Sequence, residues 1–371
     1  MIMNKIADKI AALTRSNIRA LKPYSSARDE SSKQLLEPVS GFPSNGSPRI
    51  MLDANENSFG GPLEEDFSRY PDPQQRSLKH ALANLKGLDP EQIFIGNGSD
   101  EAIDLLFRVF VEPGRDNVVI MPPTYGMYTV QADIHGAKIY HAPLRSDFSP
   151  DAELVLSVTD EFSKLLFLCS PNNPTGQSLP EDFVLDMLSS FPGVVVVDEA
   201  YADFSEKPGW ALRLHEFPNL VVLQTLSKAW GLAGLRIGMA FSNPFVINLL
   251  NKIKYPYNLS AITMRLAIEA ILKHEEVVQK TANILLERHR LEHELPRISC
   301  VEKVYPSDAN FLLVRVVDAE DVYQYLAENG IIVRNRSREP NCQNCLRITV
   351  GTETENERLL QVLAEYPKRN P

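Results

Sequence analysis

The sequence predicts an α/β fold, in which a large domain with a mostly parallel mixed sheet flanked by helices precedes a smaller α+β domain. From residue 49 onward, short apolar runs alternate with longer helical patterns, at residues 93–95, 118–121, 165–168, 194–197, 220–223 and 237–241. These runs lack the polar and apolar alternation of a half-exposed strand, which indicates strands covered on both faces by helices. The length of 371 residues is sufficient for about two domains of ordinary size.

Changes in composition divide the chain into three segments. Residues 25–48 are rich in Ser, Pro, Gly and Asn, so we expect residues 1–48 to form an N-terminal arm that packs with the small domain. Residues 49–261 hold the alternating pattern and form the expected large domain. Residues 262–371 form the expected small α+β domain, because a long charged helical stretch is followed by strand candidates at 311–316, 331–333 and 346–350.

The charge balance argues against polyanionic partners. The chain has 38 Lys and Arg against 48 Asp and Glu, a net charge of −10, and no long basic run, so neither nucleic acid nor an anionic membrane is an expected partner. No stretch reaches the roughly 18 uninterrupted apolar residues of a membrane helix. The N-terminus also lacks the apolar core of a signal peptide, so we expect a cytoplasmic protein.

Two motifs suggest metal chemistry, but their context disfavours it. Cys342 and Cys345 form a CxxC in a loop-like stretch, without the second pair or the nearby histidines of a zinc site. His289 and His293 belong to an H-x-x-E-H pattern found in one metallopeptidase class. Helical periodicity places both histidines away from the apolar stripe, and no third ligand follows. We therefore expect no metal site.

Lys228 is the most informative residue of the chain. It follows the apolar run 220–223 and lies among small residues. At the exit of a buried strand an ammonium group loses solvation, which lowers the pKa of the lysine and frees the amine as a nucleophile. Such lysines bond covalently to carbonyl groups, above all to the aldehyde of pyridoxal 5′-phosphate (PLP). Most lysines after strands have no such role, so the prediction depends on the rest of the site.

Polar groups suited to the same cofactor follow two other runs. Asp198 comes after four valines, where a carboxylate is costly to bury without a positive partner such as a pyridinium nitrogen. Tyr201 lies three residues further on, and Asn173 follows the run at 165–168 in a loop that two prolines make rigid. Both side chains can hydrogen-bond to a phenolate oxygen. The simpler alternatives are a helix cap at Asp198 and a plain turn at Asn173.

A phosphate-binding region is indicated where the run at 93–95 leads into a helix. The connecting segment Gly96–Glu101 contains Ser99 and Asp100, and backbone N–H groups at a helix start form an anion site. Arg236 could add a guanidinium group and Ser227 a hydroxyl. Helix capping explains the glycine turn about equally well. The segment matches neither a Walker A loop nor a dinucleotide-binding fingerprint.

Three further residues are candidates for the site. Tyr125, which follows Pro122-Pro123-Thr124, could stack on a pyridine ring or could be a core aromatic residue. Arg334 and Arg347 lie in the expected small domain. Strand alternation places Arg347 on the face opposite its apolar neighbours. It is either an ordinary exposed strand residue or a clamp for an anionic substrate.

Together these motifs resemble the signature of the fold-type I PLP-dependent aminotransferases. That signature comprises Ser170–Pro174, Asp198–Tyr201, Ser227–Lys228 and Arg236, in this order and spacing. Within that superfamily the chain most resembles the histidinol-phosphate aminotransferase family, over essentially its whole length. The supporting stretches are Asn17–Tyr24, Leu52–Asn57, Arg69–Pro71, Pro122–Tyr128 and Leu346–Thr352.

The resemblance implies a fold-type I architecture and a role for each candidate residue. The implied catalytic residues are Lys228, which would bind PLP covalently, Asp198, which would pair with its ring nitrogen, and Tyr201. The other implied cofactor contacts are Tyr201 and Asn173 at the phenolic oxygen, Tyr125 at the ring face, and Ser227, Arg236, Ser99 and Asp100 at the phosphate.

The resemblance also implies contacts outside the cofactor. Tyr70 would reach the cofactor's phosphate from the neighbouring subunit, which implies a homodimer. The implied substrate-binding residues are Tyr24, Asn173, Arg334 and Arg347. Arg336 and Arg338 lie beside Arg334, which leaves open which of the three meets a substrate phosphate.

The implied reaction is transfer of an amino group from L-glutamate to imidazole acetol phosphate, which gives L-histidinol phosphate and 2-oxoglutarate in histidine biosynthesis. One alternative is a related PLP enzyme with another substrate, such as an aromatic aminotransferase or a phosphothreonine decarboxylase. A second alternative is a PLP-binding regulator without activity, although residues 1–48 are too short and too weakly basic to be its DNA-binding segment.

Overall fold

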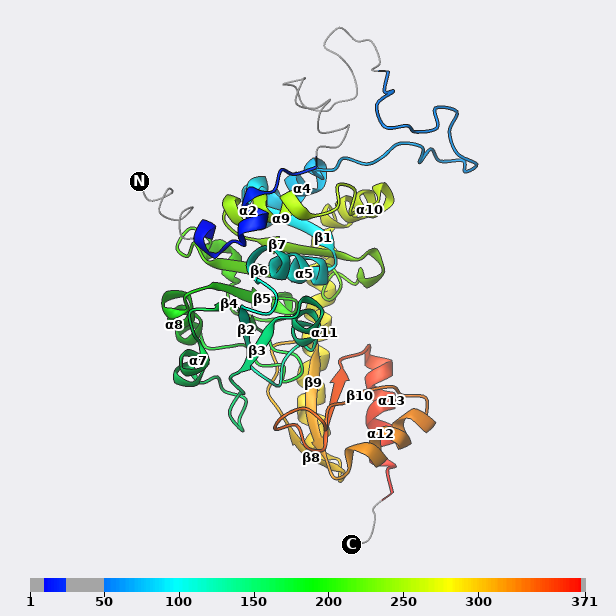
Figure 1. Ribbon diagram of the computed structural model, residues 1–371. Coiled ribbons are helices and arrows are strands. Elements are labelled where there is room, and N and C mark those ends of the chain that lie inside the picture. Colours follow the sequence, from blue (N-terminus) through cyan, green and yellow to red (C-terminus); the bar gives the residue numbers. More distant parts are fainter. Residues whose placement is uncertain (1–9, 25–49, 368–371) are drawn as a thin grey trace.

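The computed structural model describes residues 10–24 and 50–367, which contain a seven-stranded and a four-stranded sheet (Figure 1). The large sheet has the order β1-β7-β6-β5-β4-β2-β3. Its strands are β1 (Ile93–Asn97), β2 (Asn117–Ile120), β3 (Lys138–His141), β4 (Ser163–Cys169), β5 (Val194–Asp198), β6 (Leu220–Thr225) and β7 (Ile237–Phe241). Neighbouring strands run parallel except where β7 pairs with β1 and β6. The prediction of a mostly parallel mixed sheet is therefore confirmed.

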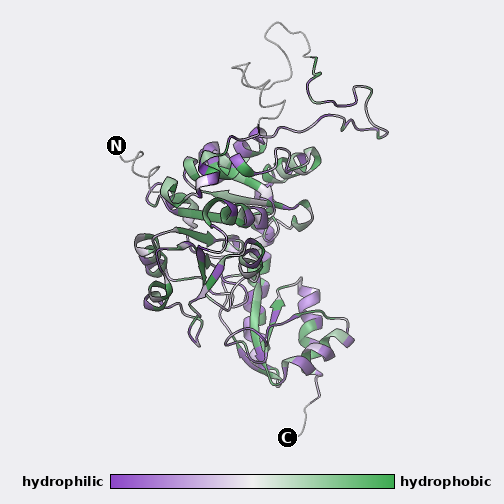
Figure 2. Ribbon diagram, viewed as in Figure 1, coloured by the Kyte–Doolittle hydropathy of each residue, from purple (hydrophilic) through white to green (hydrophobic). Residues whose placement is uncertain are grey.

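Helices cover both faces of the large sheet, which explains the uninterrupted apolar runs. In β5, Val195 and Val197 pack into one core cluster, whereas Val194 and Val196 pack into the other. The first cluster includes helices α4 (Arg76–Lys86), α7 (Ala152–Val158), α8 (Glu181–Ser190) and α10 (Ala261–Ile271). The second includes α5 (Ser99–Phe110), α6 (Met127–His135) and α9 (Pro244–Ile253). Hydrophobic residues accordingly concentrate on the central strands (Figure 2).

The edge strand β3 was not predicted from the sequence. Its four residues are exposed or half-buried, so it carries no apolar run like those of the inner strands. Short single-turn 3₁₀ helices occur at Pro90–Gln92, Ala202–Phe204, Trp210–Arg213, Ala233–Leu235 and Leu295–Arg297.

The small sheet is antiparallel and has the order β10-β11-β9-β8. Its strands are β8 (Val301–Val304), β9 (Phe311–Val316), β10 (Arg334–Asn335) and β11 (Cys345–Thr349), and its core includes residues of α11 (His274–Glu294), α12 (Ala319–Glu328) and α13 (Glu353–Ala364). The prediction of a strand at 331–333 is wrong, because the residues that pair with β11 are Arg334 and Asn335. Ile331 and Val333 instead pack against the core of this sheet.

The N-terminal arm lies elsewhere than expected. Its described part, residues 10–24 with helix α2 (Ser16–Ala20), contacts the large sheet's helices and not the small sheet. Ile10 is fully buried in the cluster that contains α5, and Arg15 forms an ion pair with Glu112. Lys252 of α9 donates to the carbonyl of Ile18. The rest of residues 1–48 lies outside the described residues.

Helix α10 packs with the large sheet although the sequence placed it in the small domain. Ala267 and Ile271 belong to the same core cluster as α4. The two sheets meet at a small cluster in which Tyr201 and Ala229 from the large sheet's loops contact Phe311 of β9. This contact brings the small sheet against the carboxyl ends of β5 and β6. Within the described ranges, none of the helices is long and apolar enough to span a bilayer.

Candidate active site

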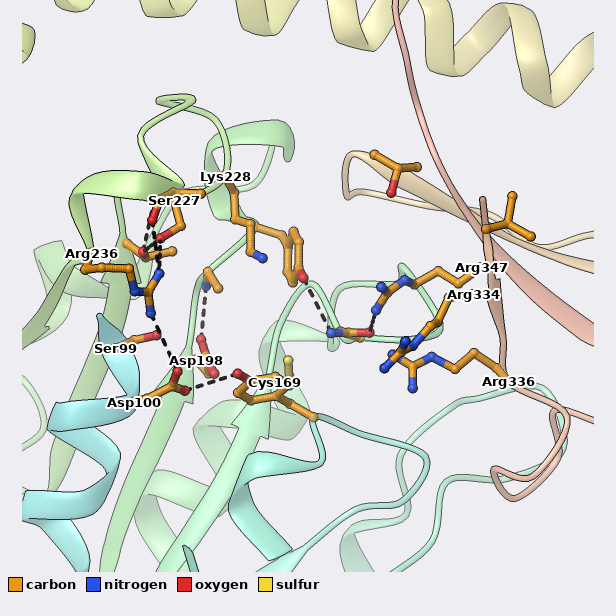
Figure 3. A pocket seen from close by; sticks show the side chains of 18 of the residues that line it. Ser99, Asp100, Cys169, Asp198, Ser227, Lys228, Arg236, Arg334, Arg336 and Arg347 are labelled. Atoms are coloured by element: carbon orange, nitrogen blue, oxygen red, sulfur yellow. Dashed lines mark hydrogen bonds and ion pairs between the residues drawn. The ribbon is translucent and has the colours of Figure 1, made fainter. Parts of the chain in front are cut away.

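A cavity of about 530 Å³ lies where the carboxyl ends of β4, β5 and β6 face the small sheet (Figure 3). Its position follows from the sheet, because parallel strands present their carboxyl ends, and the loops after them, at one edge. It is lined by Ser99, Asp100, Tyr125, Cys169, Asn173, Asp198, Ala200, Tyr201, Thr225, Ser227, Lys228, Ala233, Arg236, Ile332, Val333, Arg334, Arg336, Arg347 and Thr349. The structure thus brings together every predicted site residue except Tyr24 and Tyr70.

Lys228 lies in the cavity three residues after β6 ends. Its Nζ is 5.4 Å from the centre of the Tyr201 ring. The side chain remains accessible through the cavity, yet the surrounding walls lower the pKa of its amine by desolvation, and the positive charge of Arg347 lowers it further. Asp198 and Asp100 oppose this shift. The balance favours the neutral amine more than in an exposed lysine, as a nucleophile or a general base requires.

Asp198 is a buried carboxylate at the end of β5. Its Oδ2 accepts a 2.6 Å hydrogen bond from the hydroxyl of Tyr128, and its Oδ1 accepts from the backbone N–H of Ala200 at 3.1 Å. Burial raises the pKa of Asp198, whereas these two hydrogen bonds lower it. Within the described part of the chain no ion pair neutralises this carboxylate. A cationic N–H group in the cavity would stabilise it, and the protonated ring nitrogen of PLP is such a group.

The N-terminus of α5 lines the cavity on the side of the large sheet. Gly98 precedes the helix with φ of 78°, and the first-turn amides of Ser99 and Asp100 have no partner inside the helix. Arg236 lies across from them and reaches the Ser227 hydroxyl at 3.5 Å and the carbonyl of Ala233 at 3.2 Å. Amides, a hydroxyl and a guanidinium group are the donors that a phosphate requires.

This set of donors depends on the close approach of backbone segments that contain glycine. A Cβ atom at Gly98 would lie 2.6 Å from Nη2 of Arg236. A Cβ atom at Gly238 of β7 would lie 1.9 Å from the amide nitrogen of Ser99. The donor set and the space kept by these glycines therefore fit a phosphate group, and with Lys228 and Asp198 they fit PLP.

Tyr201, Asn173 and Arg347 form a hydrogen-bonded chain between the two sheets. Asn173 Nδ2 donates to the Tyr201 hydroxyl at 3.4 Å, and Arg347 donates to Asn173 Oδ1 at 2.6 Å. The guanidinium group of Arg347 also lies over the ring of Phe311, 5.4 Å from its centre. Burial raises the pKa of Tyr201, while the charge of Arg347 opposes that shift.

Three guanidinium groups converge at the small-sheet end of the cavity (Figure 3). Arg334 and Arg347 are register partners on β10 and β11, and Arg336 follows two residues after Arg334. Burial lowers the pKa of Arg347, and the neighbouring charge of Arg336 lowers it further. Arg338 is exposed and does not line this cavity. The arrangement is suited to binding an anion.

The aromatic candidates divide into two groups. The hydroxyl of Tyr125 donates to Asp100 at 3.1 Å, and its ring meets that of Tyr128 edge-on at 5.6 Å. Tyr24 and Tyr70 lie outside the cavity and are 76% and 51% exposed. Tyr70 stacks on Tyr257, with 4.5 Å between ring centres. Within one subunit, these two tyrosines are not brought to the site.

Sequence reasoning assigned no role to three lining or supporting residues. Tyr128 holds Asp198, and Thr225 accepts from the Ser227 amide and so orients that residue. Cys169 lies at the end of β4 and lines the cavity. Position at a strand end could have indicated Thr225 and Cys169, whereas no local pattern distinguishes the buried Tyr128 from a core tyrosine.

Neither of the two motifs considered for metal binding lines the cavity. His289 and His293 are exposed on α11, and Cys342 and Cys345 are buried free thiols. Among residues 10–24 and 50–367, no cluster of three or more His, Cys, Asp or Glu side chains could hold a metal ion. Arg288, on the same helix, is buried and donates to the carbonyl of Ala309.

Comparisons with known proteins agree with this geometry. Residues 47–363 match the family model of class I and II aminotransferases. The histidinol-phosphate aminotransferase of Parabacteroides distasonis is 49% identical over 351 residues, which cover 95% of this chain and 97% of that protein. That of Flavobacterium johnsoniae is 47% identical over 354 residues, with 95% and 97% covered.

Solved structures show the same fold. The histidinol-phosphate aminotransferase of Sinorhizobium meliloti, in complex with pyridoxal 5′-phosphate, superposes with a TM-score of 0.75 at 28% identity, over 84% of this chain and 89% of that one. The histidinol-phosphate aminotransferase of Clostridium acetobutylicum superposes with a TM-score of 0.75 at 23% identity, over 80% of this chain and 90% of that one. The chain therefore belongs to the class I and II aminotransferase family and, within it, to the histidinol-phosphate aminotransferases.

Proposed function

We propose that this protein transfers the amino group of L-glutamate to imidazole acetol phosphate, giving L-histidinol phosphate and 2-oxoglutarate, with PLP as its cofactor. The observation that carries the proposal is one cavity with an amine and a buried carboxylate at one end and three arginines at the other. The first pair suits PLP, and the arginines suit a substrate that presents a carboxylate or a phosphate. The extent of identity to curated relatives supports the specific reaction.

We assign the cofactor contacts as the sequence indicated. Lys228 would hold PLP covalently, Asp198 would pair with the ring nitrogen, and Tyr125 would cover the ring. The remaining contacts would be Tyr201 and Asn173 at the phenolic oxygen, and Ser99, Asp100, Ser227, Arg236 and the partner's copy of Tyr70 at the phosphate. When bound, PLP supplies an aldehyde that accepts the amino group and a ring that withdraws electrons from the reacting carbon.

The chain's own groups position the substrate and move its proton. The lowered pKa of Lys228 keeps part of its Nζ neutral, so that this nitrogen can take the substrate's α-proton and return it. The Tyr128 hydroxyl stabilises the ionised form of Asp198, which would keep the ring nitrogen of bound PLP protonated. Arg347 would bind the α-carboxylate of glutamate and, with Arg334 and Tyr24, the phosphate of the other substrate.

A homodimer is part of this proposal. Residues 50–70 project from the body of the subunit (Figure 1), and Leu52, Phe59 and Leu63 are 81%, 101% and 67% exposed. Large apolar side chains this exposed are typical of a protein interface. A second copy would cover them and would bring Tyr70 to a cavity that lacks it in one subunit. Sedimentation should therefore give twice the mass of the chain.

We also propose two domains and a cytoplasmic location. The packing of α10 against α4 supports a domain boundary between α10 and α11. The sequence had placed this boundary between residues 261 and 262. The four buried cysteines are unpaired, as is usual in a reducing compartment.

A turnover assay tests the reaction. The purified protein with PLP is incubated with L-histidinol phosphate and 2-oxoglutarate, and L-glutamate is measured. Lys228→Ala should abolish both turnover and the absorbance of the covalently bound cofactor. Release of CO₂ from phosphothreonine, or turnover of aromatic amino acids but not of histidinol phosphate, would instead assign a related PLP enzyme.

A further inference from the structure

We infer that Arg336 binds the substrate's phosphate and sets the preference for a phosphorylated substrate over a carboxylate. The inference rests on the proposed function and concerns the same cavity. Arg336 was one of three neighbouring arginines that the sequence could not separate. The structure separates them, because Arg334 and Arg336 line the cavity and Arg338 does not.

The backbone fixes Arg336 at the cavity. Its N–H donates to the carbonyl of Cys345 at 2.8 Å, directly beyond the pairing of β10 with β11. The same pairing sets Arg334 opposite Arg347, so three guanidinium groups enter one space from β10, from the residue that follows it, and from β11 (Figure 3). The side chain of Arg336 is 22% exposed. A planar fork held this way is pre-organised for an oxyanion.

The guanidinium group of Arg336 lacks the partners that its burial requires. Its Nε is buried and has no hydrogen-bond partner among the described residues. Its nearest carboxylate, on Glu339, lies 3.8 Å from Nη1, which is an ion pair but too long for a hydrogen bond. A buried donor without an acceptor is unfavourable, and a ligand oxygen in the cavity would satisfy it.

The charges in the cavity match a dianion better than a monoanion. Arg347 already donates to Asn173 and lies beside Lys228, where an α-carboxylate would bind. Arg334 and Arg336 add two further positive charges, and burial and mutual repulsion lower the pKa of Arg336. One carboxylate carries a single negative charge, whereas a phosphate monoester carries nearly two at neutral pH. The additional cation therefore contributes mainly when the phosphorylated substrate is bound.

The test compares Arg336→Gln with wild type, as PLP-loaded enzymes, on two substrates. With histidinol phosphate, we expect KM to rise roughly 10- to 100-fold, the range of a lost charge-assisted hydrogen bond. KM for L-glutamate should change less than about twofold. Inorganic phosphate should inhibit the glutamate reaction of wild type and inhibit the variant more weakly. Arg336→Lys should restore part of the loss, because it restores the charge but not the fork.

Arg338→Gln is the matched control, since it removes an arginine two residues away that faces solvent. It should leave both KM values unchanged. An equal rise of KM for both substrates, or a fall in kcat alone, would show that Arg336 only maintains the loop and would overturn the inference. An Arg336→Gln variant with the KM values of wild type for both substrates would also overturn it. A wild-type enzyme that does not turn over histidinol phosphate would instead refute the proposed function.

Discussion

The hydroxyl of Tyr128 donates a 2.6 Å hydrogen bond to Oδ2 of Asp198, and both side chains are buried. Tyr128 belongs to α6 and Asp198 ends β5, 70 positions apart. The ring of Tyr128 stacks on Phe167 of β4 with 4.5 Å between centres, which fixes its direction. This contact stabilises the charged form of a carboxylate that burial would otherwise neutralise.

Tyr128→Phe should therefore weaken cofactor binding. Without the hydroxyl the pKa of Asp198 rises further, and its pairing with the ring nitrogen of PLP weakens. We expect the dissociation constant of PLP to rise about tenfold, as for one lost hydrogen bond to a charged group. Absorbance titration of the apoenzyme with PLP measures it. Tyr140→Phe is the control, because it removes a tyrosine–aspartate hydrogen bond distant from the cavity. Equal PLP affinity in both variants would show that the Tyr128 hydroxyl does not support cofactor binding through Asp198.

Gly238→Ala should distort the backbone at Gly98 and Ser99, where we expect the phosphate of PLP to bind. The added Cβ would lie 1.9 Å from the Ser99 amide nitrogen and 2.1 Å from the carbonyl carbon of Gly98, and backbone cannot move aside cheaply. We expect a loss of about 3 kcal/mol in unfolding free energy, measured with urea, together with weaker PLP binding. Gly126→Ala has open space and a negative φ of −65°, so it should behave as wild type. A Gly238→Ala variant as stable as wild type would show that the two segments can separate.

Glu199 should make stability depend on pH. This buried carboxyl accepts from the Trp210 amide and from Gln224, and burial raises its pKa to about 7. The folded state thus binds its proton more tightly than the unfolded state does. The resulting stability is present below the unfolded pKa of about 4.5 and is lost as pH rises through 7.

Glu199→Gln should remove this dependence, since the amide stays neutral. Between pH 5 and pH 8, wild type should lose about 3 kcal/mol of unfolding free energy relative to the variant. Urea denaturation at both pH values measures the difference. Glu181→Gln, which changes an exposed carboxylate, should follow wild type at both. A constant difference between wild type and Glu199→Gln would mean that Glu199 ionises normally.

Arg347→Gln should impair both half-reactions, unlike Arg336→Gln. Its guanidinium group is hydrogen-bonded to Asn173, and its charge lowers the pKa of Lys228. We expect KM for glutamate and for histidinol phosphate each to rise roughly 10- to 100-fold. Steady-state kinetics with each substrate measures this. A variant that is defective with only one of them would refute a shared anion site.

Mixing two inactive variants tests whether subunits share the site. If Tyr70 acts in the partner's cavity, a hybrid of Tyr70→Ala and Lys228→Ala subunits contains one cavity with both groups intact. Activity should therefore recover after the two proteins are unfolded and refolded together, and not when each is refolded alone. Hybrid dimers that form and remain inactive would show that each Tyr70 serves its own subunit.

The sequence by itself determined the fold class and most of the cavity. Val194–Asp198 and the other uninterrupted runs indicated strands buried on both faces, and the direction of parallel strands then placed Asn173, Asp198 and Lys228 at one edge. These inferences depend on local composition and on a geometric rule that every such sheet obeys. Local pattern was weaker where exposure was mixed, so β3 was missed and the strand expected at 331–333 was misplaced.

Only the tertiary structure decided which distant side chains meet. The Tyr128–Asp198 hydrogen bond, the entry of Arg336 but not Arg338 into the cavity, and the packing of residues 10–20 on the large sheet depend on how helices and sheets pack. Periodicity along one element shows which face is buried but not which remote residue lies against it, because that contact is set by packing across the whole core.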